Sequence, residues 1–227
     1  MDSLPLEMLT LIINFGDFTE KKAPFAVLSK TWQAAIERYT FGRLYIQTKD
    51  VQDFRRILST KNRRASLYHL TWRATLPPYR RNEDYMAEVE KADEQLENDA
   101  IFTQSIVDLF SALKSWEKEM LNLKTAKMLE LEVDAVAETP EASIWGFDTV
   151  NHNRFMRSLL HLNIETPLPI LERPISFETP VYYRRYIDGS STATMASAFA
   201  NLMKLNIRLF DNEKLDPQVR QQHRYGE

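Results

Sequence analysis

The N-terminal segment carries two apolar stripes at helical spacing. Its sequence, MDSLPLEMLTLIINF, places Pro5 where a helix tolerates a missing N–H and Glu7 in the first turn. A surface helix normally has one apolar stripe and one polar face. Two stripes therefore predict a helix that is either fully internal or shared between its own core and a partner. The first stripe comprises Leu4, Met8, Leu11, Ile12 and Phe15, and the second comprises Leu6, Leu9 and Ile13.

A second helix is predicted after the loop GDFTEKK, beginning at Ala23-Pro24. Two or three short helices of this size bury too little surface to be stable alone. The unit therefore needs a neighbouring domain, a partner, or both. The apolar stripe of this second helix comprises Phe25, Leu28, Trp32, Ile36 and Tyr39.

Beyond residue 42, short segments alternate between apolar and polar positions. Such alternation over four to six residues is typical of half-buried strands. Helical patterns lie between these segments, and the alternation of strand and helix predicts βα units with a mostly parallel sheet. The strands are predicted within residues 43–47, 67–72, 128–133, 173–178 and 204–210, and the helices within 50–58, 152–162 and 192–203.

The longest insertion between predicted strands covers about residues 77–118. Its acidic part, NEDYMAEVEKADEQLENDA, is expected to be a solvated helix or a partly disordered loop. A strongly amphipathic helix follows. Its stripe indicates docking on the core of the body, with a partner-binding helix as the alternative. The stripe comprises Phe102, Ile106, Leu109, Phe110, Leu113 and Trp116.

Composition narrows the possible chemistry. The 227 residues include no cysteine, which excludes disulfides, thiolate nucleophiles and cysteine-ligated metals. The net charge of −3 provides no bulk attraction for nucleic acid or for an anionic membrane surface. We expect no targeting or membrane-spanning segment, since no apolar run approaches the required length. A cytoplasmic or nuclear location, or both, is the simplest interpretation.

No catalytic, cofactor or metal motif is visible. The four histidines are scattered, and five glycines provide no phosphate-binding loop. A GxSxG nucleophile elbow is also missing. Arginine doublets near tyrosines could suggest a nucleic-acid surface, but they fit ordinary surface solubility better. We therefore predict no catalytic residue, no cofactor and no metal, and a small enzyme with an unrecognised site is kept as an alternative.

The N-terminal motifs resemble an F-box. The residues concerned are LPLE at 4–7, the pair Ile12-Ile13, and the segment AVLSKTW with Ser29 and Trp32. The continuation QAAIERYTFGRLYI is similar to the segment after the F-box in fungal F-box proteins with leucine-rich-repeat-like bodies. Gly16 and Lys22 depart from the family pattern, which usually has leucine at both positions.

The resemblance implies an α/β architecture with two domains. Residues 1–42 would form the helical F-box domain. Residues 43–227 would form a short, irregular leucine-rich-repeat-like β/α solenoid with a long helical insertion. Regular leucine-rich repeats recur every 20–29 residues or so. The spacing here is uneven, so we expect an irregular and shortened or truncated body.

The resemblance also implies a function without catalysis. F-box modules bind a Skp-family adaptor, which would make this chain a substrate receptor of a cullin–RING (SCF-type) ubiquitin ligase that holds an unidentified protein substrate. An F-box scaffold acting outside ubiquitin ligation is the alternative. Glu7 and Ser29 are expected to cap or orient helices. The residues expected to contact the adaptor are Leu4, Pro5, Met8, Ile12, Leu28 and Trp32.

Overall fold

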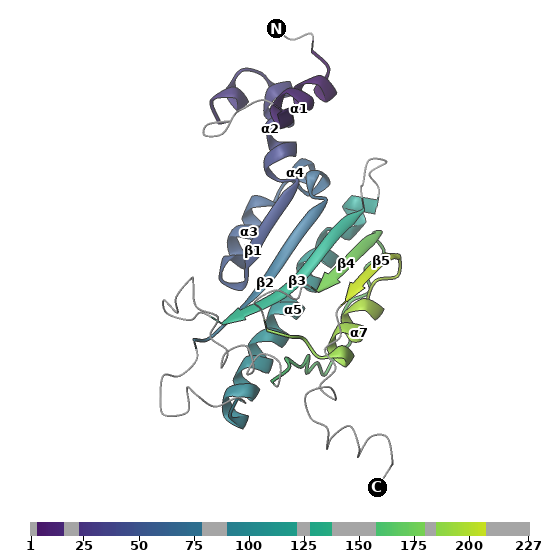
Figure 1. Cartoon of the computed structure of the whole chain (residues 1–227). Helices are drawn as coiled ribbons and strands as arrows, with labels where there is room; N and C mark the ends of the chain where they lie inside the picture. The colour runs from purple at the N-terminus through teal and green to yellow at the C-terminus, as the bar shows by residue number, and fades with distance from the viewer. Residues whose placement is uncertain are drawn as a thin grey trace.

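Five parallel strands form the central sheet of the molecule. The computed structural model describes residues 4–15, 23–78, 90–121, 128–137, 158–179 and 185–207. The strands lie in the order in which they occur along the chain, and each pairs with the next. The predicted mixed α/β class and parallel sheet are confirmed (Figure 1). The strands are β1 (Arg43–Gln47), β2 (His69–Leu76), β3 (Leu129–Ala137), β4 (Ile175–Thr179) and β5 (Leu202–Ile207).

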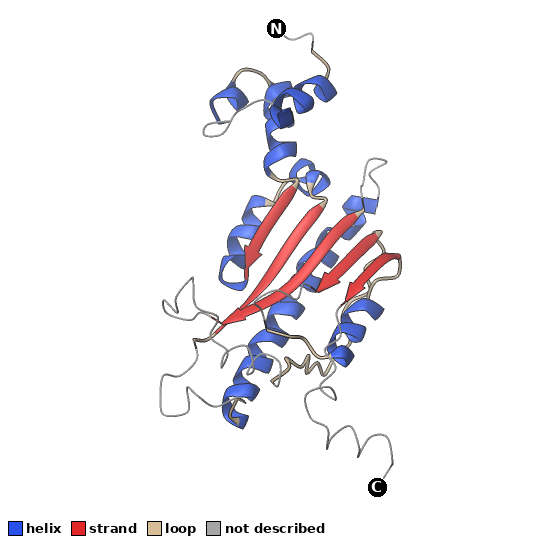
Figure 2. Ribbon diagram, in the orientation of Figure 1, coloured by secondary structure: helices blue, strands red, loops and turns tan. Residues whose placement is uncertain are grey.

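The helices fall into two groups (Figure 2). A helical hairpin precedes the sheet and stands beyond one end of it. It consists of α1 (Leu6–Phe15), the short 3-10 helix η1 (Ala23–Val27) and α2 (Lys30–Thr40). The remaining helices belong to the body, which we define as β1 to β5 with their connections. They are η2 (Thr48–Asp50), α3 (Val51–Ile57), α4 (Lys61–Ser66), α5 (Ala92–Leu121) and α7 (Gly189–Ser197).

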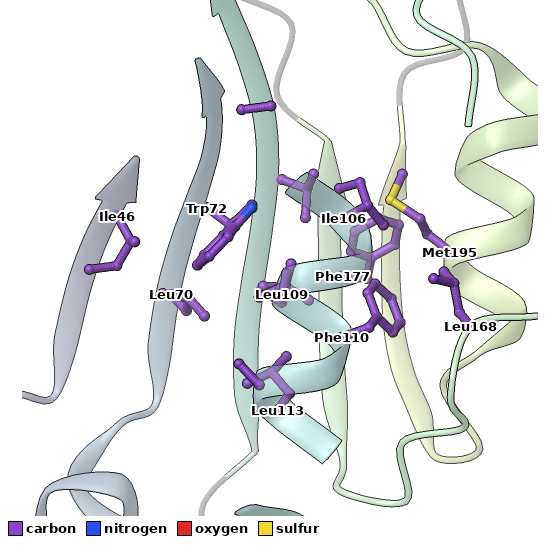
Figure 3. Close-up of a cluster of buried hydrophobic side chains, with 14 of the residues drawn as sticks. Ile46, Leu70, Trp72, Ile106, Leu109, Phe110, Leu113, Leu168, Phe177 and Met195 are labelled. Carbon is purple, nitrogen blue, oxygen red and sulfur yellow. The ribbon is translucent and has the colours of Figure 1, made fainter. Parts of the chain in front are cut away.

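The body core forms where α5 packs on the sheet. Figure 3 shows Ile106, Leu109 and Phe110 of α5 among the side chains of the strands, and all three are fully buried. Trp72 of β2 is also fully buried, and its indole N–H donates to Ser105 Oγ of α5 at 2.9 Å. The predicted amphipathic helix therefore docks on the core, as the residue pattern indicated. It lies within the connection that crosses from β2 to β3.

Three predicted elements differ from the structure. The second hairpin helix is interrupted, because η1 ends at Val27 and α2 begins at Lys30. The predicted helix 192–203 is shifted, since α7 ends at Ser197 and Leu202 opens β5. The predicted helix 152–162 is wrong over 158–162, where the chain is irregular, and its first six residues lie outside the described part. The insertion residues 79–89 also lie outside that part.

The sheet face away from α5 is polar and cross-linked by side chains. His69 of β2 lies 3.0 Å from Glu130 of β3 through its Nδ1. Arg73 donates two hydrogen bonds to the buried carboxylate of Asp134, at 2.8 and 2.9 Å. The Arg73 guanidinium also lies over the ring of Tyr45, 4.7 Å from its centroid. These contacts fix β1, β2 and β3 relative to one another, in the manner of cross-strand pairs.

A fully buried ion pair closes the body near the start of α5. The Arg185 guanidinium bonds both carboxylate oxygens of Glu90, and neither side chain is exposed. Asn98 of α5 donates to the same carboxylate at 3.1 Å, and Arg185 donates to the Ser158 carbonyl at 2.8 Å. Burying two charges is tolerated only when they are paired and hydrogen-bonded, and here both oxygens of Glu90 and both terminal nitrogens of Arg185 are bonded. The pair therefore joins three segments that are distant in the sequence.

The hairpin is held on the body through α2 and α4. Arg63 of α4 donates to Glu37 of α2 from Nη2 at 3.0 Å and from Nε at 3.3 Å. The same guanidinium donates to the Ile57 carbonyl and lies 4.7 Å from the centre of the Phe41 ring. Both charged side chains are partly buried, so this pair is screened less than a fully exposed one.

Gly42 makes the close passage from α2 to β1 possible. Its carbonyl accepts the backbone N–H groups of Tyr68 and His69, each at 3.0 Å. A Cβ atom at this position would lie 2.7 Å from the Arg38 carbonyl oxygen and 2.7 Å from the Tyr68 ring. No side chain fits without moving backbone, so glycine sets how closely the hairpin approaches β2.

Candidate partner-binding surface on the helical hairpin

One stripe of α1 forms the hairpin's own core. Leu9 and Ile13 are each only 2% exposed and pack against Ala35 and Ile36 of α2. Leu6 and Phe25 are partly buried at the edge of this cluster. The cluster is separate from the body core and holds far fewer residues. The second stripe predicted from the sequence therefore faces α2.

The other stripe of α1 faces solvent. We call Leu4, Met8, Leu11 and Ile12 the outer stripe, and these side chains are 43%, 48%, 48% and 38% exposed. The helix is therefore not fully internal, which leaves the shared-helix interpretation of its two stripes. A contiguous exposed row of large aliphatic side chains is typical of an interaction surface rather than of ordinary solvated helix.

A second exposed apolar site lies where η1 turns into α2. Val27 and Leu28 are 84% and 59% exposed. Ser29 follows as the N-cap of α2, because its Oγ accepts the backbone N–H of Trp32 at 3.3 Å. This cap ends the apolar run before α2 begins, so Val27 and Leu28 protrude at a corner instead of packing along a continuous helix.

Most residues expected to contact an adaptor are exposed in the structure. Leu4, Pro5, Met8, Ile12 and Leu28 are all exposed, as is Glu7 in the first turn of α1. Trp32 differs from them. It is partly buried in the hairpin and stacks on Phe25, with ring centroids 5.7 Å apart. Its main contribution in this structure is to the packing of η1 against α2.

Sequence reasoning missed two residues of this surface. Leu11 was placed on the first stripe by its spacing, in the same row as Leu4 and Met8, but it was not included among the residues expected to contact the adaptor. Val27 carries no such signal, because its exposure depends on the break between η1 and α2. We define the hairpin surface as Leu4, Met8, Leu11, Ile12, Val27 and Leu28.

A second histidine–carboxylate pair of the body lies between α5 and the start of α7. His161 Nδ1 lies 3.3 Å from Asp99 Oδ2, and the His161 backbone N–H donates to Asp99 Oδ1 at 2.9 Å. The nearby Asp188 caps α7, and the Ser190 hydroxyl donates to it. Burial alone would raise the pKa of Asp188. The hydrogen bonds from Ser190 and Ser191, together with His161, outweigh burial and lower that pKa. The Ser190 hydroxyl thus donates to the carboxylate that caps α7.

The body also encloses a small apolar cavity between α4, α5 and the strands. Its volume of about 20 Å³ admits about one water molecule. Arg173 lines it, and burial lowers the pKa of this guanidinium to about 10. Its Nη2 donates to the Leu67 carbonyl at 2.7 Å. Such a cavity is too small for a substrate, but two larger open hollows lie on the surface, one of about 280 Å³ beside Leu168 and Thr194 and one of about 540 Å³ beside Val27 and Ser29. Among the described residues, no three acidic or histidine side chains gather closely enough to hold a metal ion.

Comparison with known proteins adds no relative to this description. No family model matches the chain, and no curated protein or solved structure is detectably similar to it. Across the described part of the chain, no helix combines the length and the apolar character required to cross a bilayer. The function must therefore be argued from the chain's own residues.

Proposed function

We propose that the chain is a substrate-receptor subunit of a cullin–RING ubiquitin ligase, and that its hairpin surface binds a Skp-family adaptor. The observation that carries this proposal is the outer stripe of α1, which stays exposed although α1 already has a packed inner stripe. A partner that covers the stripe would remove this apolar area from water. Because the same residues resemble an F-box, we expect this partner to be a Skp-family adaptor.

The expected binding energy is concentrated in a few aliphatic side chains. Each large apolar side chain that moves from water into a desolvated groove stabilises the complex by roughly 1.5–3 kcal/mol. The hairpin surface offers six such residues, and interfaces of this kind depend on a few central anchors. Helix-in-groove recognition fits a surface that presents one row along α1 and a corner at Val27 and Leu28.

The proposed mechanism is positional. The hairpin would hold the adaptor, while the body would hold a protein substrate near the enzyme that transfers ubiquitin. Such tethering raises effective concentration without chemistry by the receptor itself. The contact between Arg63 and Glu37, with the close passage at Gly42, supports this role because it fixes the hairpin on the body.

Co-purification with a recombinant Skp-family adaptor tests the proposal directly. The variant Met8→Glu/Leu11→Glu places two carboxylates on the outer stripe, where both native side chains are 48% exposed. We expect adaptor affinity to fall on the order of 100-fold or more, because two anchors are lost and two charges face an apolar groove.

A matched control comes from α5. Leu96→Glu/Leu121→Glu makes the same chemical change at two exposed positions, 67% and 45% exposed, neither of which belongs to the hairpin surface. This variant should bind the adaptor as the wild-type chain does. Failure of the wild-type chain to bind would refute the adaptor proposal, and undiminished binding by the α1 variant would show that the surface is wrongly placed. Recovery of cullin and of ubiquitin transfer with the complex would separate a receptor from a scaffold.

A further inference from the structure

The edge of β5 carries apolar side chains that face solvent. Met203 and Leu205 are 67% and 46% exposed, on a strand of six residues. Over the part of the chain that the structure describes, β5 pairs only with β4, on its inner side. Backbone N–H and C=O groups on the outer side of an edge strand are a template for one more strand.

An apolar row that runs across the sheet ends at this edge. The cross-strand register places Leu205 of β5 beside Phe177 of β4, which lies beside Leu131 and then Leu70. The three inner members are at most 1% exposed, whereas Leu205 is about half exposed. A strand added outside β5 would therefore extend both the backbone ladder and this row.

The helix beside β5 offers little for a further strand–helix unit to pack against. A partner at this edge is therefore better taken as a single strand. The most exposed positions of α7 are polar or small, at Ser190, Ala193 and Ser197. A further strand–helix unit would need large apolar side chains on the flank of α7 to pack its own helix. That flank carries none, while the adjoining strand edge is apolar.

A second copy of the chain fits the edge poorly. A stable protein–protein interface takes about 20–30 residues from each partner. The edge of β5 offers six residues, and the flank of α7 adds no large apolar side chain. Short extended peptides bind such edges without a large interface, because backbone hydrogen bonds supply affinity and alternate side chains supply specificity.

We infer that the outer edge of β5 binds an extended segment of the recruited protein as a sixth strand. The segment would carry apolar residues beside Leu205 and an acidic residue beside Lys204, the exposed cation at the middle of β5. Opposite charges on neighbouring strands stabilise the pairing, and like charges weaken it. The inference rests on the proposed function in taking this segment to belong to a substrate.

A synthetic peptide tests the edge itself. The probe is acetyl-Thr-Val-Glu-Val-Glu-Val-Thr-amide, titrated against the full chain by isothermal calorimetry and by NMR. Two further peptides carry N-methyl groups on alternate residues, so that each blocks hydrogen bonding along one edge of the peptide. Strand addition predicts that one methylated isomer loses about tenfold or more in affinity, while the other binds within about twofold of the parent.

Two variants test the side-chain chemistry. Leu205→Asp should weaken binding of the parent peptide about tenfold, with melting temperature and circular dichroism showing that the body stays folded. Lys204→Glu should weaken the parent peptide and restore binding to the peptide in which lysine replaces both glutamates. This charge exchange is informative even where Leu205→Asp fails to fold.

The outcomes separate the inference from its alternatives. Absence of binding, or equal binding by both methylated isomers, overturns strand addition at β5. Slow hydrogen exchange throughout β5 in the isolated chain also overturns it, since the edge would then be covered by residues 208–227 or by a second copy. Adaptor capture is measured on the same variants and should be unchanged, so that failure at β5 and failure at the hairpin surface are distinguishable.

Discussion

The hairpin and the body use apolar residues in opposite ways. The body gathers its large side chains into one core of many residues, in which Trp72, Phe54 and Phe110 are fully buried. Among its described residues, the hairpin buries Leu9, Ile13, Ala35 and Ile36, and it exposes about as many large aliphatic side chains as it packs. A region that leaves many of its apolar side chains in water gains little free energy from folding alone, so its stability depends on what it contacts.

The largest expected effect lies in the body core. Trp72→Ala removes a fully buried indole, its edge-to-face contact with Phe54 at 5.6 Å and its hydrogen bond to Ser105. Truncations of this kind cost about 3–5 kcal/mol. Urea denaturation followed by circular dichroism should show the free energy of unfolding reduced by that amount. A loss below about 1 kcal/mol would mean that the body core is less tightly packed than the structure describes.

Leu9→Ala tests how much the small core of the hairpin contributes to stability. It should cost about 2–3 kcal/mol, near the lower end for buried leucine, because the hairpin core is small and close to solvent. The loss of stability should also be confined to the hairpin. Amides of α1 and α2 should exchange hydrogen faster, while those of α5 and β3 keep their protection. Equal acceleration in both regions would show that hairpin and body unfold as one unit.

The smallest expected effect is on the contact that joins the two regions. Glu37→Gln removes the charge that pairs with Arg63, and partly buried pairs of this kind contribute about 0.5–1 kcal/mol. The melting temperature should therefore fall only slightly at low salt and still less at high salt. Spin labels on α2 and α4 should nevertheless report a broader distance distribution. An unchanged distribution would leave Gly42 and the backbone as the sole source of the fixed arrangement.

Much of the fold could be predicted from local sequence patterns. Each strand has one apolar face, so alternation alone located all five. Parallel pairing followed from the helices between them. The helix α4 was missed because KNRRAS has no apolar period, and its position depends instead on contacts such as that between Arg63 and Glu37. Leu202 was assigned to a helix because an alanine-rich run precedes it, whereas its pairing with Ile175 places it in β5.

Part of the hairpin surface could also be predicted from the sequence. The two stripes of α1 could be read directly, because helical spacing separates them whatever the rest of the chain does. Which stripe faces α2 could not, since both are aliphatic and only packing against Ala35 and Ile36 decides it. The exposure of Val27 was also hidden, because a single cap at Ser29 redirects the chain there.

The strand order has a consequence for how the body responds to force. Each strand is bonded only to its neighbours in the chain, so a pull on the β5 end loads one backbone ladder at a time. Parallel neighbours in this order can separate stepwise, as in repeat proteins whose units contact only adjacent units. The first step is release of β5 from β4, and the last strands to separate are those that α5 covers. A motor protein that pulls the chain from that end would therefore unfold it stepwise. Strand β5 would be lost while the hairpin is still folded.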